Sequence, residues 1–106
     1  NKSKIQIFYD SKKAANDSDV IFTDKVISMN DKVNKAKKLR EFKNFQVNSQ
    51  VMRHAKRDAI FLHCLPRGRE VSDDVFHSNQ SKVWQQALNR VYVQKSILLY
   101  CFNKLR

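Results

Sequence analysis

Three side chains that can do chemistry follow two short apolar runs of the sequence. Asp24 comes directly after Val20–Thr23, and His63 and Cys64 come directly after Ala59–Leu62. A short, continuous apolar run is typical of a strand that is buried on both faces of a parallel sheet. In open sheets of this kind, ligands bind beyond the carboxyl ends of the strands. The spacing therefore predicts that these three side chains reach one edge of a sheet, beside a binding crevice.

These residues taken alone leave a second interpretation open. A cysteine beside a histidine at a strand end is more often a buried thiol next to a hydrogen-bonded imidazole. A carboxylate in the position of Asp24 is most often a helix cap or a solvated turn residue.

A β-α-β pattern surrounds these residues. Residues 4–9 alternate and then turn apolar, which predicts a first strand, and Asp10 or Ser11 can cap a short helix over 13–16. Further helices are predicted over about 31–42, 50–55 (capped by Asn48 or Ser49) and 82–102, where Ser81 can be the cap. Alternating strands and helices predict an α/β fold with parallel strands and right-handed crossovers.

Length and composition limit the kind of protein. A chain of 106 residues is at most one small domain, and a hydrophobic content of 42% argues against disorder. Cys64 and Cys101 are too few for a disulfide scaffold, and no apolar run approaches the length of about 20 residues that spans a bilayer. We therefore expect reduced thiols, a cytoplasmic location and no membrane partner.

The net charge of +11, with a pI near 10.0, is the usual footprint of nucleic-acid binding. The lysines, however, are spread over several segments, with a dense group in residues 32–43, and they do not alternate with aromatic side chains. No helix-turn-helix, zinc-finger or RNA-binding motif is visible. We expect a solvated basic face and no nucleic-acid partner. A non-catalytic, basic nucleic-acid-binding module remains an alternative.

Three short motifs of the sequence resemble those of one enzyme family. His63-Cys64-Leu65-Pro66 resembles the H-C-L-P signature of ornithine carbamoyltransferases. Asp24 with Ser28-Met29 resembles their D-x-x-x-S-M element, and Asn89-Arg90 resembles their late N-R element. Aspartate carbamoyltransferases, the sister enzymes, typically have proline where Cys64 stands. The resemblance covers nearly the whole chain, but only the C-terminal part of the family's chain.

The resemblance implies a fold and a role for each residue. The fold would be a three-layer, Rossmann-like parallel sheet with flanking helices, present as a partial domain. Catalytic roles fall to Cys64, Asp24 and Arg90. Ornithine would be bound by Asp24, Ser28, Met29 and Cys64, and carbamoyl phosphate by His63, Cys64, Leu65 and Arg90. A carboxylate suits the α-ammonium group of an amino acid, and a guanidinium suits an oxyanion.

The implied reaction is carbamoyl transfer. The δ-amino group of L-ornithine would attack the carbonyl carbon of carbamoyl phosphate, giving L-citrulline and phosphate in arginine biosynthesis or a urea-cycle step. Catalysis would come from positioning and from stabilising the developing charge, so no metal or organic cofactor is implied. A transcarbamylase for a related amine, such as N-acetylornithine or putrescine, is the enzymatic alternative.

The resemblance also implies an incomplete enzyme. Residues 1–106 would form part of the C-terminal ornithine-binding domain, without the N-terminal carbamoyl-phosphate domain and its S-x-R-T-R element. The helix over 82–102 is apolar nearly all round after Ser96, and it would dock back on the missing domain. We expect this chain to be inactive by itself and the complete enzyme to be a homotrimer.

The loop after Asp24 departs from the family pattern. The family usually has an aromatic residue two positions after the aspartate and a glycine after the Ser-Met pair; Val26 and Asn30 stand there. Asparagine tolerates the left-handed backbone conformation better than most residues, so the turn can form. Lys25, directly after Asp24, is placed to compete with ornithine for the carboxylate.

Overall fold

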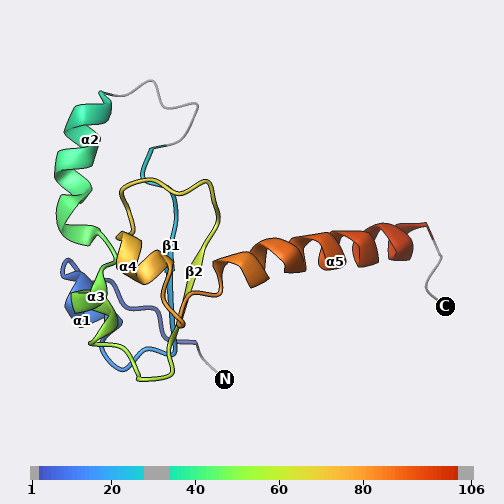
Figure 1. Ribbon diagram of the computed structural model, residues 1–106, viewed down its shortest axis with the longest axis horizontal. Helices are drawn as coiled ribbons and strands as arrows, with labels where there is room; N and C mark the ends of the chain where they lie inside the picture. The colour runs from blue at the N-terminus through green and yellow to red at the C-terminus, as the bar shows by residue number, and fades with distance from the viewer. Residues whose placement is uncertain (1–2, 28–33, 103–106) are drawn as a thin grey trace.

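Two parallel strands form the centre of the fold in a computed structural model, which describes residues 3–27 and 34–102 (Figure 1). β1 (Val20–Thr23) and β2 (Ile60–His63) pair in register, from Val20 opposite Ile60 to Thr23 opposite His63. Because the paired strands run in the same direction, their carboxyl ends finish level at one edge.

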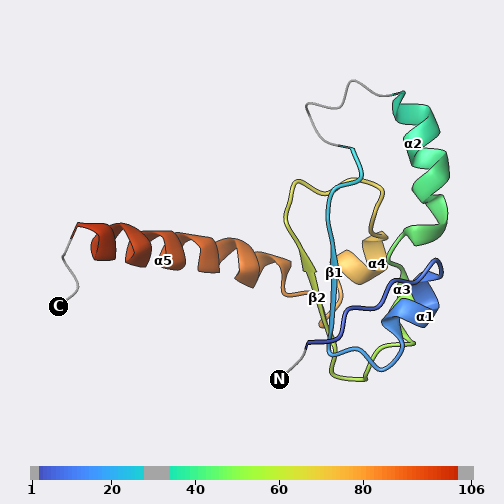
Figure 2. The same ribbon diagram turned by 180° about the vertical axis from the view of Figure 1, so that it is seen from behind.

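Short helices connect and cover these strands. In chain order they are α1 (Ser11–Ala15), α2 (Lys35–Phe42), the 3₁₀ turn η1 (Lys43–Phe45), α3 (Ser49–Met52), α4 (Asp73–Phe76) and α5 (Val83–Cys101). α1 and α3 lie side by side on one flank of the strands, whereas α5 extends away from the rest of the molecule in both Figure 1 and Figure 2. The class is α/β with flanking helices, as predicted.

The core lies on the side of the sheet that faces α1, α3 and α4. Ile21 and Phe61, which are paired in the register, point into it, and Phe61 is fully buried. The other buried apolar members are Ala15, Val47, Val51, Met52, Val71, Val75, Phe76 and Val83. Burial alternates along both strands, and Val20 and Phe22 stay half exposed. The prediction that both faces are buried is therefore wrong for β1 in this chain.

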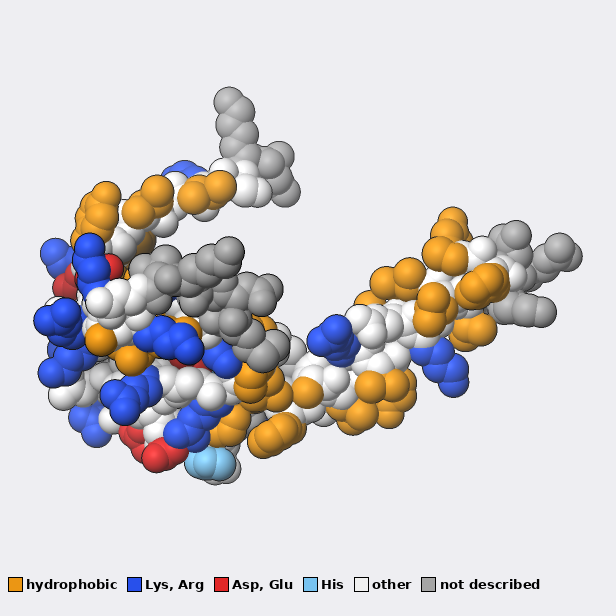
Figure 3. Space-filling model, turned by 90° about the horizontal axis from the view of Figure 1, so that it is seen from above, with side chains coloured by type: hydrophobic (Ala, Val, Ile, Leu, Met, Phe, Trp, Pro, Cys, Tyr) orange, Lys and Arg blue, Asp and Glu red, His pale blue; other side chains and the backbone are white. Residues whose placement is uncertain are grey.

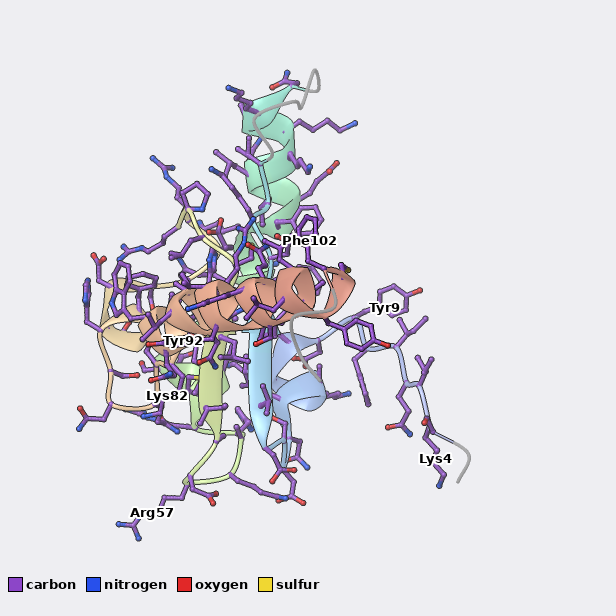
Figure 4. All side chains as sticks on the ribbon, turned by 90° about the vertical axis from the view of Figure 1, so that its right-hand side faces the viewer. Lys4, Tyr9, Arg57, Lys82, Tyr92 and Phe102 are labelled. Atoms are coloured by element: carbon purple, nitrogen blue, oxygen red, sulfur yellow. The ribbon has the colours of Figure 1, made fainter. Side chains whose placement is uncertain are left out.

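The amino-terminal segment forms no strand, contrary to the prediction for residues 4–9. Ile5, Ile7 and Tyr9 are almost fully exposed, and Figure 4 shows the segment that bears Lys4 and Tyr9 running along the outside of the molecule. An alternating apolar pattern gives a strand only when a neighbouring strand accepts its backbone hydrogen bonds. The sheet in the described part of the chain consists of β1 and β2 alone.

Helix caps follow the sequence closely at two places. The side chain of Asp10 accepts from Lys12 N–H to cap α1, and that of Asn48 accepts from Val51 N–H to cap α3. The last helix begins one residue later than predicted, with Lys82 at its N-cap rather than Ser81. The sequence also predicts a cap for α2 at Asn30 or Asp31, which lie outside the described residues, but the helix begins later: Asn34 is its N-cap, and its side chain accepts from the N–H groups of Ala36 and Lys37. Among the helices that are described, none combines the length and apolar character that a bilayer crossing needs.

Candidate functional site at the carboxyl edge of the sheet

A thiol and a carboxylate meet where the two strands end. Thr23 is paired with His63, so the next residues, Asp24 and Cys64, leave the sheet side by side. Cys64 Sγ donates to Asp24 Oδ1 over 3.0 Å, although 40 positions separate the two residues in the sequence. Both side chains are exposed. The structure thus brings together the two groups that the sequence predicted at one edge of the sheet.

The contact between Cys64 and Asp24 shifts the pKa values of both groups. The hydrogen bond from Cys64, followed by one from the backbone N–H of Lys25 at 2.6 Å, lowers the pKa of the Asp24 carboxyl. The same thiol–carboxylate bond, with a smaller contribution from burial, raises the pKa of Cys64. At neutral pH the site therefore holds one carboxylate and a protonated thiol. A protonated thiol is a weak nucleophile, which argues against a covalent intermediate on Cys64.

His63 lies inside the molecule rather than in the crevice. Its side chain is fully buried, and its Nε2 is 2.8 Å from Oε1 of the buried Glu70. Its Nδ1 accepts from the backbone N–H of Leu65 at 2.8 Å. The expectation that the imidazole is delivered to a binding crevice is therefore wrong. The part of the second interpretation that concerns a hydrogen-bonded histidine is right, whereas its buried cysteine is not.

Leu65, in the turn after β2, has an unusual backbone conformation. Leu65 has a φ of 54°, in the left-handed region that leucine rarely adopts, and its side chain packs against the core. Its N–H donates to His63 Nδ1, so this polar backbone group is already bound within the turn.

Arg90 is not joined to the pair. It is exposed on α5, and no hydrogen bond or ion pair among the described residues connects it with Asp24 or Cys64. It shares a helix face with Gln86, one turn earlier, whose Oε1 accepts from the backbone N–H of His63 at 3.0 Å. Arg90 therefore lies on the face of α5 that is hydrogen-bonded, through Gln86, to the end of β2. Ser28 and Met29 lie outside the described residues.

Sequence reasoning missed Gln86 and Glu70. Gln86 has a usable signal, since it precedes Arg90 by four positions on a helix. Glu70 has none, because its place beside His63 depends on the path of the turn between them.

Two adjoining hollows open next to the loop that follows Asp24. Their volumes are about 320 and 550 Å³, and they share Val26, Leu39, Arg69 and Glu70 as lining residues. Four more cationic side chains line one or the other: Lys25, Lys35, Arg40 and Lys43. Such a lining favours a ligand that carries negative charge. In the part of the chain that the structure describes, no three His, Cys, Asp or Glu side chains gather as a metal site requires.

Comparison with known proteins identifies the family. The family model for the aspartate/ornithine carbamoyltransferase, Asp/Orn binding domain, matches residues 1–101. The chain belongs to this family. The ornithine carbamoyltransferase of Methanococcus maripaludis is 52% identical over 93 residues, which are 85% of this chain and 31% of that protein.

Solved structures of family members agree. The ornithine carbamoyltransferase from Pyrococcus furiosus superposes with a TM-score of 0.77 at 47% identity, over 85% of this chain and 29% of that one. The anabolic ornithine carbamoyltransferase from Campylobacter jejuni gives a TM-score of 0.80 at 39% identity, over 92% and 33%. The chain spans about a third of the length of the family members it matches.

Proposed function

We propose that this chain is the ornithine-binding part of an ornithine carbamoyltransferase. The complete enzyme transfers the carbamoyl group of carbamoyl phosphate to the δ-amino group of L-ornithine, giving L-citrulline and phosphate in arginine biosynthesis. The observation that carries the proposal is the contact between Cys64 Sγ and Asp24 Oδ1 at the carboxyl edge of the sheet. The names of the similar proteins support the same reaction.

The charge of the pair suits an amino acid with a cationic amino group. Asp24 keeps its negative charge at neutral pH and accepts hydrogen bonds from the α-ammonium group of ornithine. The protonated thiol of Cys64 adds a polar group without a second charge, and it orients the δ-amine for attack. Ser28 and Met29, four and five positions after Asp24 in the sequence, bind the same amino acid.

Carbamoyl phosphate lies on the other side of the pair. The backbone of His63, Cys64 and Leu65 meets its carbamoyl group, and Arg90 binds its phosphate. The chain itself contains no S-x-R-T-R element for the phosphate. An N-terminal carbamoyl-phosphate domain supplies that element, in a homotrimeric, cytoplasmic enzyme.

The exposed apolar side chains of α5 support the proposal that a second domain completes the enzyme. Figure 3 shows hydrophobic side chains along α5. Its apolar residues Leu88, Val91, Ile97 and Leu98 are all about half exposed. A helix that is apolar over several faces needs protein on more than one side. The N-terminal domain provides that cover, which turns Arg90 towards the substrates.

Ornithine binding to the 106-residue chain tests the proposal. L-Ornithine, titrated while backbone amide chemical shifts are followed by NMR, is expected to move the signals of Asp24, Lys25 and Cys64. Asp24→Asn should abolish these shifts, whereas Asp58→Asn, an exposed carboxylate just before β2, should preserve them. Ornithine shifts that survive Asp24→Asn would refute the proposal.

Related amines separate the enzymatic alternatives. N-acetylornithine has no α-ammonium group, and putrescine has neither an α-ammonium nor a carboxylate. If Asp24 binds the α-ammonium group, both compounds should shift the same signals less than ornithine does at equal concentration. An equal or larger response to either compound would assign the site to that amine instead.

A further inference from the structure

Two polar side chains lie inside the described core, and they contact each other. His63 is 1% exposed and Glu70 is 5% exposed. His63 Nδ1 accepts from Leu65 N–H, so the ring proton is on Nε2, which donates to Glu70 Oε1. The carboxylate also accepts from the backbone N–H of Gly68. One hydrogen-bonded chain therefore runs from Glu70 through the imidazole to the backbone of Leu65.

This chain of hydrogen bonds holds the residues on both sides of Cys64. His63 is anchored by its ring, and also by its backbone N–H on Gln86. Leu65 is anchored by its N–H in a left-handed conformation that its side chain does not favour. The backbone of Cys64 therefore lies between two anchored residues, and its thiol donates to Asp24.

Glu70 also touches the loop that carries Asp24. Burial by itself raises the pKa of Glu70, but hydrogen bonds from backbone N–H groups, those of Gly68 and Glu70 first, and from His63 together lower it. The backbone N–H of Val26, two residues after Asp24, adds to this lowering. The ionised carboxylate thus lies between the two loops that supply the thiol and its partner.

We propose that Glu70 is a positioning residue for the Cys64–Asp24 pair, acting through His63 and the Leu65 amide. Its carboxylate sets the imidazole tautomer, the tautomer holds the Leu65 N–H, and the Leu65 backbone fixes the direction of the thiol. This role follows from the geometry of the turn, so it does not depend on which substrate binds at the carboxyl edge of the sheet.

Gly68 provides a way to displace this carboxylate without removing its charge. A Cβ atom added at Gly68 would lie 2.6 Å from Glu70 Oε2, closer than real contacts allow. The atom that must move is the end of a flexible side chain, so Gly68→Ala leaves the backbone in place and pushes the carboxylate aside.

Alkylation of the thiol reads out its position. In a Cys101→Ser background, Cys64 is the one cysteine. Its rate of alkylation by iodoacetamide at pH 8 reports its thiolate fraction, which the hydrogen bond to Asp24 lowers. Release of the turn separates the thiol from the carboxylate and raises its thiolate fraction. We expect Glu70→Leu and Gly68→Ala to react at least about three times faster than the parent chain.

Matched variants distinguish hydrogen bonding from general loosening. Glu70→Gln retains an oxygen that accepts from His63 Nε2, so its rate should stay within about twofold of the parent. Glu41→Leu removes an exposed carboxylate of α2 and should have no effect. ¹⁵N chemical shifts of the His63 ring should show a single tautomer in the parent and in Glu70→Gln, and a mixture of tautomers in Glu70→Leu.

The inference is overturned if folded Glu70→Leu keeps both the parent rate and the parent tautomer. Circular dichroism checks the fold of each variant, and if Glu70→Leu is unfolded, Gly68→Ala decides by the same alkylation rate. No substrate enters these measurements, so a failure to bind ornithine leaves their outcome unchanged.

Discussion

Gln86 fastens α5 to the end of β2, and its replacement by alanine tests how that helix is held. Its Oε1 accepts from the backbone N–H of His63, a residue buried at the carboxyl edge of the sheet. The preceding residue, Gln85, is an exposed glutamine in the same turn of α5, and its Nε2 donates to the side chain of Asn89. The two glutamines therefore form a matched pair.

The hydrogen bonds set the size of the effect. Gln86→Ala leaves a buried N–H without its acceptor, which costs about 1–2 kcal/mol of unfolding free energy. Gln85→Ala loses an exposed i,i+4 contact worth about 0.2–0.5 kcal/mol. The gain in helix propensity from alanine, less than about 0.7 kcal/mol, is common to both variants. We therefore expect Gln86→Ala to be less stable than Gln85→Ala by about 1 kcal/mol.

Urea unfolding followed by circular dichroism measures this difference directly. In a thermal scan it corresponds to a midpoint lower by about 4–8 °C for a domain of this size. If the unfolding free energies of the two variants agree within about 0.3 kcal/mol, the His63–Gln86 hydrogen bond does not hold α5 on the sheet. The placement of the Arg90 face beside β2 would then lose its support.

Three further perturbations have expected outcomes. The contact with Asp24 raises the pKa of Cys64, so Asp24→Asn should shift the pH profile of Cys64 alkylation to lower pH; an unchanged profile would contradict the contact. The pKa of Glu70 is lowered in the folded chain, so its ionisation adds stability above its ordinary value of 4.5 and this is lost as pH falls through the folded pKa. The urea midpoint should therefore drop less between pH 7 and pH 3 in Glu70→Gln than in the parent chain, and equal drops would count against that pKa shift. Removal of the α3 cap by Asn48→Ala should cost about 1 kcal/mol in urea unfolding, whereas Asn79→Ala, an exposed turn residue, should cost less than half of that.

The meeting of Asp24 and Cys64 was predictable because it follows from local patterns. Two apolar runs of similar length predict two parallel strands, and each chemical group follows its run directly. The caps at Asp10 and Asn48 were predictable for the same reason, since a cap and the N–H groups it accepts from are two or three residues apart.

The partner of His63 depended on a contact that the strand pattern does not contain. His63 lies two residues after Phe61, on the buried face of β2, and the path of the following turn brings Glu70 to its ring. The strand predicted over residues 4–9 failed for a related reason. Its alternation is real, but a strand also needs a partner for its backbone, and β1 and β2 do not supply one in the described chain.

The alternation of strands and helices, and the chemical group that follows each strand, could be predicted from the sequence, because each of these depends on residues that are close neighbours. The tertiary structure decided which side chains are buried, which nitrogen of His63 carries the proton, and which face of α5 meets the sheet. These properties depend on the path of the turn from His63 to Glu70 and on contacts such as that between Gln86 and His63, so they exist only once the chain has folded.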